Sequence, residues 1–189
     1  THFFFFFMSE FKTVKSSKVT LSVLMLPSHS NFSGKIHGGY ILSLLDQIAF
    51  ACASKFSGHY CVTASVDTVD FLNPIEVGEL VTLKACVNYV GKSSMVVGIR
   101  VEAENIQTGQ VKHCNSSYFT MVAKDYDGKN TNVPGLILSS QQDIKRFINC
   151  VKQISLKKER SLHETIYDYK SEKALEELKK YNVKLDQNQ

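Results

Sequence analysis

The sequence predicts an α+β fold in which an antiparallel β-sheet packs on one long central helix. The first observation is the order of the elements: one strand-like stretch, one long apolar segment, and then four strand-like stretches. The second is the hairpin length of the connections between the later stretches, since parallel neighbours need longer crossovers. The third is the segment at residues 40–56, which is apolar nearly all round the helix and contains neither proline nor glycine. Such a helix is expected to be buried on most sides.

The strand-like stretches share a richness in β-branched and aromatic residues and are bounded by turn residues. The first precedes the helix and is followed by a polar loop. Dipeptides such as Asn73-Pro74 and Gly91-Lys92 separate the later ones. The five stretches cover residues 18–26, 60–71, 80–90, 94–104 and 110–123. One sheet wrapped round one helix leaves its other face to be covered, so we expect a dimer.

After residue 125 the composition and the periodicity of the sequence change, which indicates an appendage to the sheet domain. The next residues are polar and contain glycine and proline, which is typical of a linker. Beyond them apolar residues recur at helical spacing, and we expect two helices near residues 141–157 and 162–181. The predicted organisation is an N-terminal extension with little fixed structure, a main α+β domain, a linker and a C-terminal helical extension, at residues 1–17, 18–125, 126–139 and 140–189.

The N-terminal residues THFFFFFM contain five consecutive phenylalanines. This run is too short to span a bilayer, which needs about 20 apolar residues, and it lacks the basic start and cleavage site of a signal peptide. We interpret it as an upstream extension, with Met8 as the natural start, and we expect no membrane partner. The alternative is an aromatic plug that packs on a neighbouring subunit.

The composition is that of an ordinary globular protein. Of the 189 residues, 43% are apolar and 21% are charged. The formal net charge is +4, from 22 basic and 18 acidic side chains, and this excess is too small to indicate a nucleic-acid partner. The five cysteines are odd in number and include no C-x-x-C pair, which favours a reducing, cytoplasmic compartment and no structural zinc.

The stretch NFSGKIHGGYILSLLDQIAF, residues 31–50, carries the candidate chemistry. Gly38 and Gly39 stand where the helix begins, and a helix start offers free backbone N–H groups and a partial positive charge. Glycine lets a ligand approach this backbone closely, so these N–H groups can hold a carbonyl oxygen that becomes negative during a reaction. About two turns later Asp46 interrupts the apolar helix, where an unpaired buried charge is expensive.

Asp46 has small neighbours at helical spacing, Ser43 and Ala49, which leave room beside its carboxylate. Apolar surroundings disfavour the charged form of a carboxyl group and so favour its use as a general base. The alternatives are that Asp46 bonds a backbone group or faces a polar subunit seam. Taken alone, His37 is a loop histidine and Asn31 is a turn residue.

The pattern N-x-x-G-x-[IV]-H-G-G, followed seven residues later by aspartate, resembles the hotdog-fold acyl-CoA thioesterases. Within that family the sequence resembles the YciA-like bacterial enzymes and the brain-type cytosolic acyl-CoA hydrolase. Two further segments resemble the same family, VTASVDTVDFLNPIEVGELV at residues 62–81 and GKSSMVVGIRVEAE at residues 91–104. The resemblance spans about residues 19–125. It implies a hotdog fold, with an antiparallel sheet wrapped round a central long helix, to which two extra C-terminal helices are added.

The resemblance implies roles for individual residues. Asp46 matches the family's catalytic acid, Asn31 matches its water- or carbonyl-positioning amide, and the Gly39 N–H would polarise the thioester carbonyl. The implied subunit forms a homodimer by joining two sheets edge to edge, often further assembled as a trimer of dimers, with the active site at the dimer seam. Asn31 and Asp46 of one site would then come from opposite subunits.

The resemblance also implies a binding path for coenzyme A. The strand at residues 63–65 would pair with the pantetheine arm through its backbone, and the turn at residues 92–94 would meet phosphate oxygens. The YciA-like enzymes often carry phenylalanine where this chain has His37, which argues against a catalytic role for this histidine. The expected substrate-binding residues are His37, Gly38, Thr63, Ala64, Ser65, Lys92, Ser93 and Ser94. The alternative for the lysine is an exposed turn residue.

The predicted activity is hydrolysis of acyl-CoA to a free fatty acid and CoA. Coenzyme A is then part of the substrate, and we expect no separate cofactor and no metal. Asp46 either removes a proton from water or attacks the carbonyl carbon directly. Two alternatives stand beside hydrolysis: a hotdog dehydratase or hydratase that pairs His37 with Asp46, and a non-catalytic acyl-CoA-binding domain.

Overall fold

The computed structural model describes residues 10–67, 69–164, 171–178 and 180–183. The chain divides into two compact units at residue 150. The elements before this boundary are β1 (Phe11–Thr13), α1 (Val14–Ser17), β2 (Val19–Leu24), a 3-10 turn (Pro27–His29), α2 (Gly38–Ser57), β3 (Tyr60–Val66), β4 (Asp70–Phe71), β5 (Glu79–Val90), β6 (Ser94–Asn105), β7 (Val111–Lys124) and β8 (Gly135–Ile137). α3 (Gln141–Glu164) begins in the first unit and ends in the second, and α4 (Glu172–Leu178) lies in the second.

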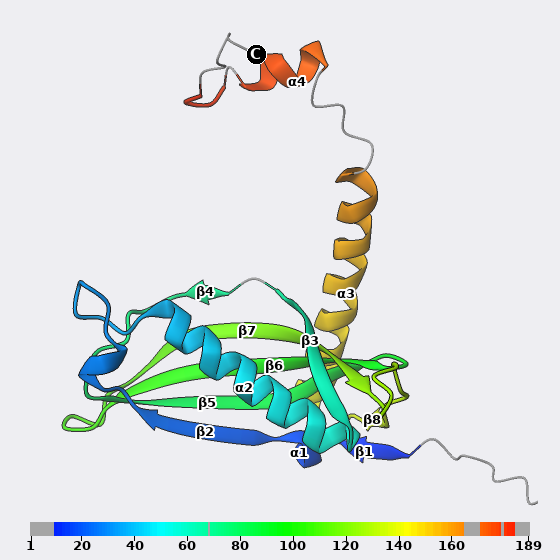
Figure 1. Ribbon diagram of the computed structural model, residues 1–189, viewed down its shortest axis with the longest axis horizontal. Helices are drawn as coiled ribbons and strands as arrows, with labels where there is room; N and C mark the ends of the chain where they lie inside the picture. Colours follow the sequence, from blue (N-terminus) through cyan, green and yellow to red (C-terminus); the bar gives the residue numbers. More distant parts are fainter. Residues whose placement is uncertain (1–9, 68, 165–170, 179, 184–189) are drawn as a thin grey trace, which may run out of the picture. The chain divides into compact units, whose positions relative to one another are not determined.

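A six-stranded antiparallel sheet with α2 lying across one face forms the centre of the first unit (Figure 1). The strand order is β2-β5-β6-β7-β3, and β4 pairs with β7. β5, β6 and β7 follow one another as long hairpins, as their short connections predict. The predicted α+β arrangement is therefore confirmed. One stretch differs: residues 60–71 form two strands, β3 and β4, which pair with successive parts of β7.

The core lies between α2 and the sheet. Alternate side chains of β5, β6 and β7 point toward the helix because successive residues of a strand face opposite sides. The largest fully buried side chains include Leu45, Ile48, Phe56, Leu83, Val97, Phe119 and Met121. The helix ends at Gly58, whose φ of 75° is the left-handed conformation that glycine adopts most easily.

One face of α2 remains uncovered in the single chain. The sequence predicts burial on most sides, but Leu42, Asp46 and Phe50 are exposed. They follow one another at intervals of four residues, so they form one stripe along the side of the helix that does not face the sheet. Leu42 and Phe50 each keep 39% of their surface exposed, which is high for apolar residues in the middle of a long helix.

β3 is the edge strand beside this stripe. It ends the strand order of the sheet, so its second edge has no partner strand among the described residues. The β3–β7 register shifts between Thr63 and Ser65, which places a local irregularity at Ala64. Tyr60 at the start of β3 is 65% exposed and meets the Phe50 ring edge-on, with 5.5 Å between the ring centroids.

The N-terminal segment is more ordered than the sequence predicts. Residues 11–17 were expected to have little fixed structure, but β1 pairs in parallel with β8, and α1 buries Val14 and Ser17. Ser17 Oγ accepts a hydrogen bond from the Val87 N–H at 2.9 Å. The predicted linker likewise contains β8. The pairing joins segments more than a hundred residues apart, which local patterns cannot reveal. The phenylalanine run and Met8 lie outside the described residues.

Two C-terminal helices are present as predicted, with different bounds. α3 runs through residue 164 instead of ending near 157. Within the second expected helix, at residues 162–181, α4 covers residues 172–178, and residues 165–170 and 179 lie outside the described residues. The first turns of α3 belong to the sheet domain, since the Phe147 ring lies 5.2 Å from that of Tyr89 and Arg146 donates to Cys86. The division between units therefore falls at residue 150 rather than near 140. No helix within the described ranges is both long and apolar enough to cross a membrane.

All five cysteines are buried free thiols. Their places in apolar runs predict this, because a free cysteine packs as a small hydrophobic residue. Burial raises the pKa of Cys52 to about 12 and that of Cys150 to about 11. Both side chains are therefore uncharged thiols at neutral pH.

Candidate active site

The loop before α2 holds Asn31 by its carbonyl oxygen. Asn31 Oδ1 accepts hydrogen bonds from the Ser33 N–H at 2.9 Å, the Ser33 hydroxyl at 2.7 Å and the Lys35 N–H at 3.2 Å. This is the turn role that asparagine commonly has. The side-chain NH₂ group has no hydrogen-bond acceptor among the described residues. Asn31 is therefore fixed by one end and presents a donor at the other.

His37 caps the start of α2. Its Nδ1 accepts a hydrogen bond from the Gly39 N–H at 3.0 Å. The Gly39 N–H was expected to be free to polarise a carbonyl, and in this conformation it is not. The reason is local, because a side chain at the N-cap position satisfies one of the N–H groups that a helix start leaves unpaired. The Phe71 ring covers the neighbouring Gly38, where an added Cβ would lie 3.4 Å from the ring.

Asp46 is held by a residue from β3. Thr63 Oγ1 donates a hydrogen bond to Asp46 Oδ1 at 2.6 Å. The sequence predicts a substrate-binding role for the backbone of Thr63, and it gives no sign that this side chain contacts the acid. Asp46 is exposed in the single chain, so the burial predicted for it is not provided by its own subunit. Its second oxygen has no partner among the residues that the structure describes.

The surroundings of Asp46 combine polar and apolar side chains. Ser43, one turn earlier, accepts a hydrogen bond from Gln47 Nε2 at 3.2 Å. Ala49 is fully buried, so it lines the core rather than the space beside the carboxylate. The exposed Leu42 and Phe50 flank Asp46 one turn before and one turn after it. A carboxylate with a polar partner thus stands within an uncovered apolar stripe.

The turn at residues 92–94 lies at the far end of the sheet from the start of α2. The Ser93 carbonyl accepts from the Ala123 N–H, and Ala123 pairs with Cys61, just after the C-terminal end of α2. The helix has 20 residues and so spans about 30 Å. Lys92 is exposed. A single chain therefore does not bring the predicted phosphate-binding turn to Asn31, Gly38 and Gly39.

The predicted site residues thus fall into three groups in one chain. Asn31, His37, Gly38 and Gly39 gather at the start of α2, and Thr63 joins Asp46 beside Ala64 and Ser65 on β3. Lys92, Ser93 and Ser94 form the third group, in the β5–β6 turn. No group of three histidine, cysteine, aspartate or glutamate side chains that could hold a metal ion occurs in the described part of the chain. The absence of a metal or cofactor requirement stays a prediction.

Comparison with known proteins identifies the family. The family model of the thioesterase superfamily matches residues 33–110. Protein VdlD of Helicobacter pylori is 41% identical over 141 residues, which cover 75% of this chain and 80% of that protein. The uncharacterized acyl-CoA thioester hydrolase YkhA of Bacillus subtilis is 34% identical over 154 residues, covering 82% of this chain and 90% of the relative. The cytosolic acyl coenzyme A thioester hydrolase of Rattus norvegicus is 31% identical, and the match covers 71% of this chain but 36% of that longer protein.

Solved structures agree with this assignment. An apo-hexameric acyl-CoA thioesterase superposes with a TM-score of 0.78 at 32% identity, over 80% of this chain and 97% of its own. The acyl-CoA hydrolase of Staphylococcus aureus, in complex with butyryl coenzyme A and coenzyme A, gives a TM-score of 0.76 at 30% identity, over 82% and 94%. That enzyme has also been solved with an aspartate, an asparagine or a threonine replaced by alanine. The chain therefore belongs to the thioesterase superfamily and, within it, to the acyl-CoA thioester hydrolases of hotdog fold.

Proposed function

We propose that this protein hydrolyses acyl-CoA thioesters with Asp46 as the general base. The observation that carries the proposal is the hydrogen bond from Thr63 to Asp46, which orients an exposed carboxylate beside an apolar surface. The three positions altered in the Staphylococcus aureus enzyme support it. Its asparagine, aspartate and threonine are separated by 15 and then 17 residues, and so are Asn31, Asp46 and Thr63.

The mechanism follows from the free atoms of the site. Because Thr63 donates to Oδ1, Asp46 Oδ2 is left to accept a proton from water. The water oxygen then bonds to the thioester carbon, the C–S bond breaks, and Asp46 passes the proton it took from water to the sulfur of coenzyme A. A positioned general base is worth about 10²–10⁴ in rate.

The developing negative charge on the carbonyl oxygen needs donors. The Asn31 NH₂ group is one, and each such donor contributes about 10²–10³ in rate. The Gly39 N–H becomes a second donor once the His37 ring turns away from it. Because His37 Nδ1 faces Gly39 rather than Asp46, the geometry does not favour the histidine–acid pair of a dehydratase.

We propose that a second copy of the chain completes the site. Gly39 and Asp46 are seven residues apart on one helix, a rise of about 10 Å, which is too far for one carbonyl to meet both. The edge of β3 that has no partner strand among the described residues lies beside the exposed stripe of α2, and together they suit an edge-to-edge dimer. Asn31 of one subunit would then meet Asp46 of the other. The hexameric relatives support further assembly as a trimer of dimers.

The same dimer gives a path for coenzyme A. The irregular β3 backbone around Ala64 would pair with the pantetheine amides, close to Asp46. Lys92, Ser93 and Ser94 would contact the phosphates from another subunit, since one chain holds them at the wrong end of α2. A cytoplasmic location is supported by the five free thiols and by the cytosolic relative.

Release of free thiol from a panel of acyl-CoA substrates tests the activity. Hydrolysis produces one thiol per turnover, whereas hydration produces none and a binding domain shows no turnover. Asp46→Asn should abolish most of the release while preserving the melting temperature. Thiol release at the wild-type rate from this variant would refute the general-base role.

Co-expression of two inactive variants, Asn31→Ala and Asp46→Asn, tests the shared site. In a mixed dimer one site carries both changes and the other carries neither. With random pairing, half the dimers are mixed, so about a quarter of the wild-type sites should return. Purification through two different tags enriches the mixed assemblies. If the doubly tagged protein is as inactive as either parent, Asn31 and Asp46 do not act together across a subunit interface.

A further inference from the structure

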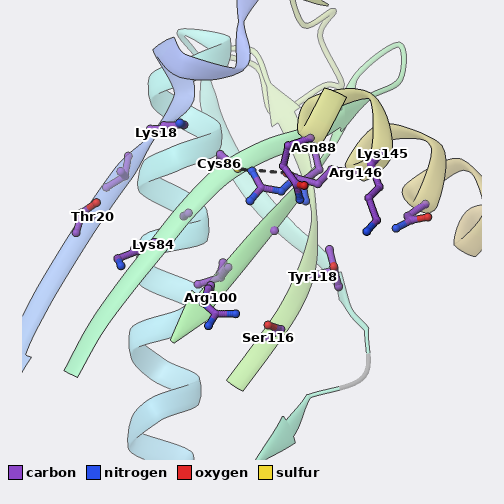
Figure 2. Close-up of a pocket in the computed structure, with 16 residues that line it drawn as sticks. Lys18, Thr20, Lys84, Cys86, Asn88, Arg100, Ser116, Tyr118, Lys145 and Arg146 are labelled. Atoms are coloured by element: carbon purple, nitrogen blue, oxygen red, sulfur yellow. Dashed lines mark hydrogen bonds between the residues drawn. The ribbon is translucent and has the colours of Figure 1, made fainter. Parts of the chain in front are cut away.

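The face of the sheet opposite α2 carries a cavity of about 450 Å³ beneath the first turns of α3 (Figure 2). Its floor comes from β2, β5, β6 and β7, and the charged side chains of the floor stand at positions that alternate with those facing the core. Its roof comes from residues 142–149. The volume lies within the range of small-molecule sites, about 300–1,000 Å³. Asp46 is on the other side of the sheet, so this cavity is separate from the proposed thioester site.

The lining of the cavity is strongly basic. Two of its cations are already paired, since Lys84 and Arg100 bind the Glu102 carboxylate at 2.6 and 2.7 Å. These hydrogen bonds lower the pKa of Glu102 to about 2, so it stays charged. The remaining cations have no ion-pair partner among the described residues, and the other acids near the cavity are Asp143 and Asp67. The five cations that line the cavity are Lys18, Lys84, Arg100, Lys145 and Arg146.

Arg146 and Lys18 both place positive charge near the Cys86 thiol in the floor of the cavity. Burial raises the pKa of the Cys86 thiol, and both cations oppose this rise. Arg146 Nη1 also donates to Cys86 Sγ at 3.6 Å, shown as a dashed line in Figure 2. Arg146 on α3 and Lys18 at the end of α1 therefore place this positive charge near Cys86 from two separate elements.

A buried amide stands in the wall beside these cations. Asn88 is 4% exposed, and its Oδ1 accepts from Cys86 Sγ at 3.3 Å. Gly98 on the neighbouring strand leaves the space for this amide, because a Cβ there would lie 2.1 Å from Asn88 Nδ2. Any other residue at position 98 would displace the amide from the wall. The cavity thus combines several cations with a buried polar group.

We propose that this cavity is an anion site for a small molecule that carries two adjacent phosphate groups. Three cations that have no ion-pair partner among the described residues, Lys145 and Arg146 on α3 and Lys18 at the end of α1, suit a ligand with more than one negative charge. Arginine and lysine together suit phosphate, the first through paired N–H donors and the second as a point charge. The source is either free diphosphate or the diphosphate of a nucleotide. Tyr118 lines the cavity and is 41% exposed. If the ligand is a nucleotide, its base would stack on this ring, whereas free diphosphate has no group that could do so.

Calorimetric titration of the whole protein with pyrophosphate and with ADP, at low salt, tests the site. We expect one ligand per chain and an affinity that falls as salt is raised. Lys18→Gln with Lys145→Gln should weaken binding at least tenfold, and Arg146→Gln provides an independent second variant. The matched control is Lys152→Gln with Lys158→Gln, which removes two cations from α3 outside the cavity and should change the affinity less than twofold.

The two sources give different patterns. Equal affinity for both probes indicates that the diphosphate alone is recognised. Tighter binding of ADP, lost in Tyr118→Leu, indicates a nucleotide. Thermal unfolding and thiol release check that each variant is folded.

Three results would overturn the proposal. The first is no measurable binding of either probe at millimolar concentration. The second is equal weakening in the cavity variant and its matched control, which would indicate a general effect of net charge. The third is loss of binding in Lys92→Gln without loss in the cavity variants, which would place the ligand at the proposed substrate site instead.

Discussion

Replacement of Thr63 by valine removes the hydrogen bond that orients the Asp46 carboxylate among the described residues. The Oγ1–Oδ1 distance of 2.6 Å is typical of a hydroxyl that donates to a charged oxygen. Valine keeps the branched shape of threonine, so the strand loses only the donor. A hydrogen bond to a charged group contributes about 1.5–3 kcal/mol, and the lower end applies here because both side chains are exposed in the single chain. Since about 1.4 kcal/mol corresponds to a factor of ten, we expect kcat to fall about tenfold.

The assay is thiol release from one acyl-CoA over a range of concentrations, which separates kcat from KM. Thr63→Ser keeps the hydroxyl and is the matched control, expected to retain most of the activity. KM should change little in Thr63→Val, because the lost contact positions the base rather than the substrate. A valine variant within twofold of the wild-type kcat would refute this role for the hydroxyl. A rise in KM alone would assign Thr63 to substrate binding.

Three further substitutions test other parts of the proposed mechanism, each by thiol release and thermal unfolding. Asp46→Asn should lower kcat by about 10²–10⁴, the usual worth of a positioned base, with no loss of stability. Asn31→Ala should lower kcat less, by about 10²–10³, because it removes one donor, and an unchanged rate would return Asn31 to a turn residue. His37→Phe should keep substantial activity, since it frees the Gly39 N–H, but should lower stability by about 1 kcal/mol through loss of the cap. Near-total loss of turnover would instead assign His37 to catalysis.

The sequence predicts most of the fold because local patterns determine most of it. The apolar run at residues 40–56 lies within α2, and the turn dipeptides lie between the strands that pair as hairpins. Hairpin pairing needs only neighbours in the sequence, so short-range signals are sufficient. β1 and β8 are missed because they join residues 11–13 to residues 135–137, and three-residue strands have too little pattern to predict a partner.

The sequence proposes residues for the candidate site, whose roles stay predictions, but it does not predict the contacts between them. The HGG turn and Asp46 stand out in the sequence as a helix start and a charge within an apolar helix, and the resemblance to the hotdog thioesterases implies their roles. Two contacts are not predictable in this way. The Thr63 hydroxyl meets Asp46 only because β3 lies beside α2 in space, and His37 takes up the Gly39 N–H only because its ring folds back on the helix start. Both depend on side-chain conformations that spacing alone does not specify.

The exposure of Asp46 explains how a charge can occupy the middle of an apolar helix. In the single chain the carboxylate is exposed and bonded to Thr63, so the subunit folds without burying an unpaired charge. The same stripe exposes Leu42 and Phe50, and covering these apolar residues favours association of two subunits. If a second copy covers the stripe, it encloses Asp46 and, in the proposed dimer, places its own Asn31 beside this carboxylate. Assembly would then enclose the base and deliver its donor in one step, so that the unassembled subunit folds but has no complete site.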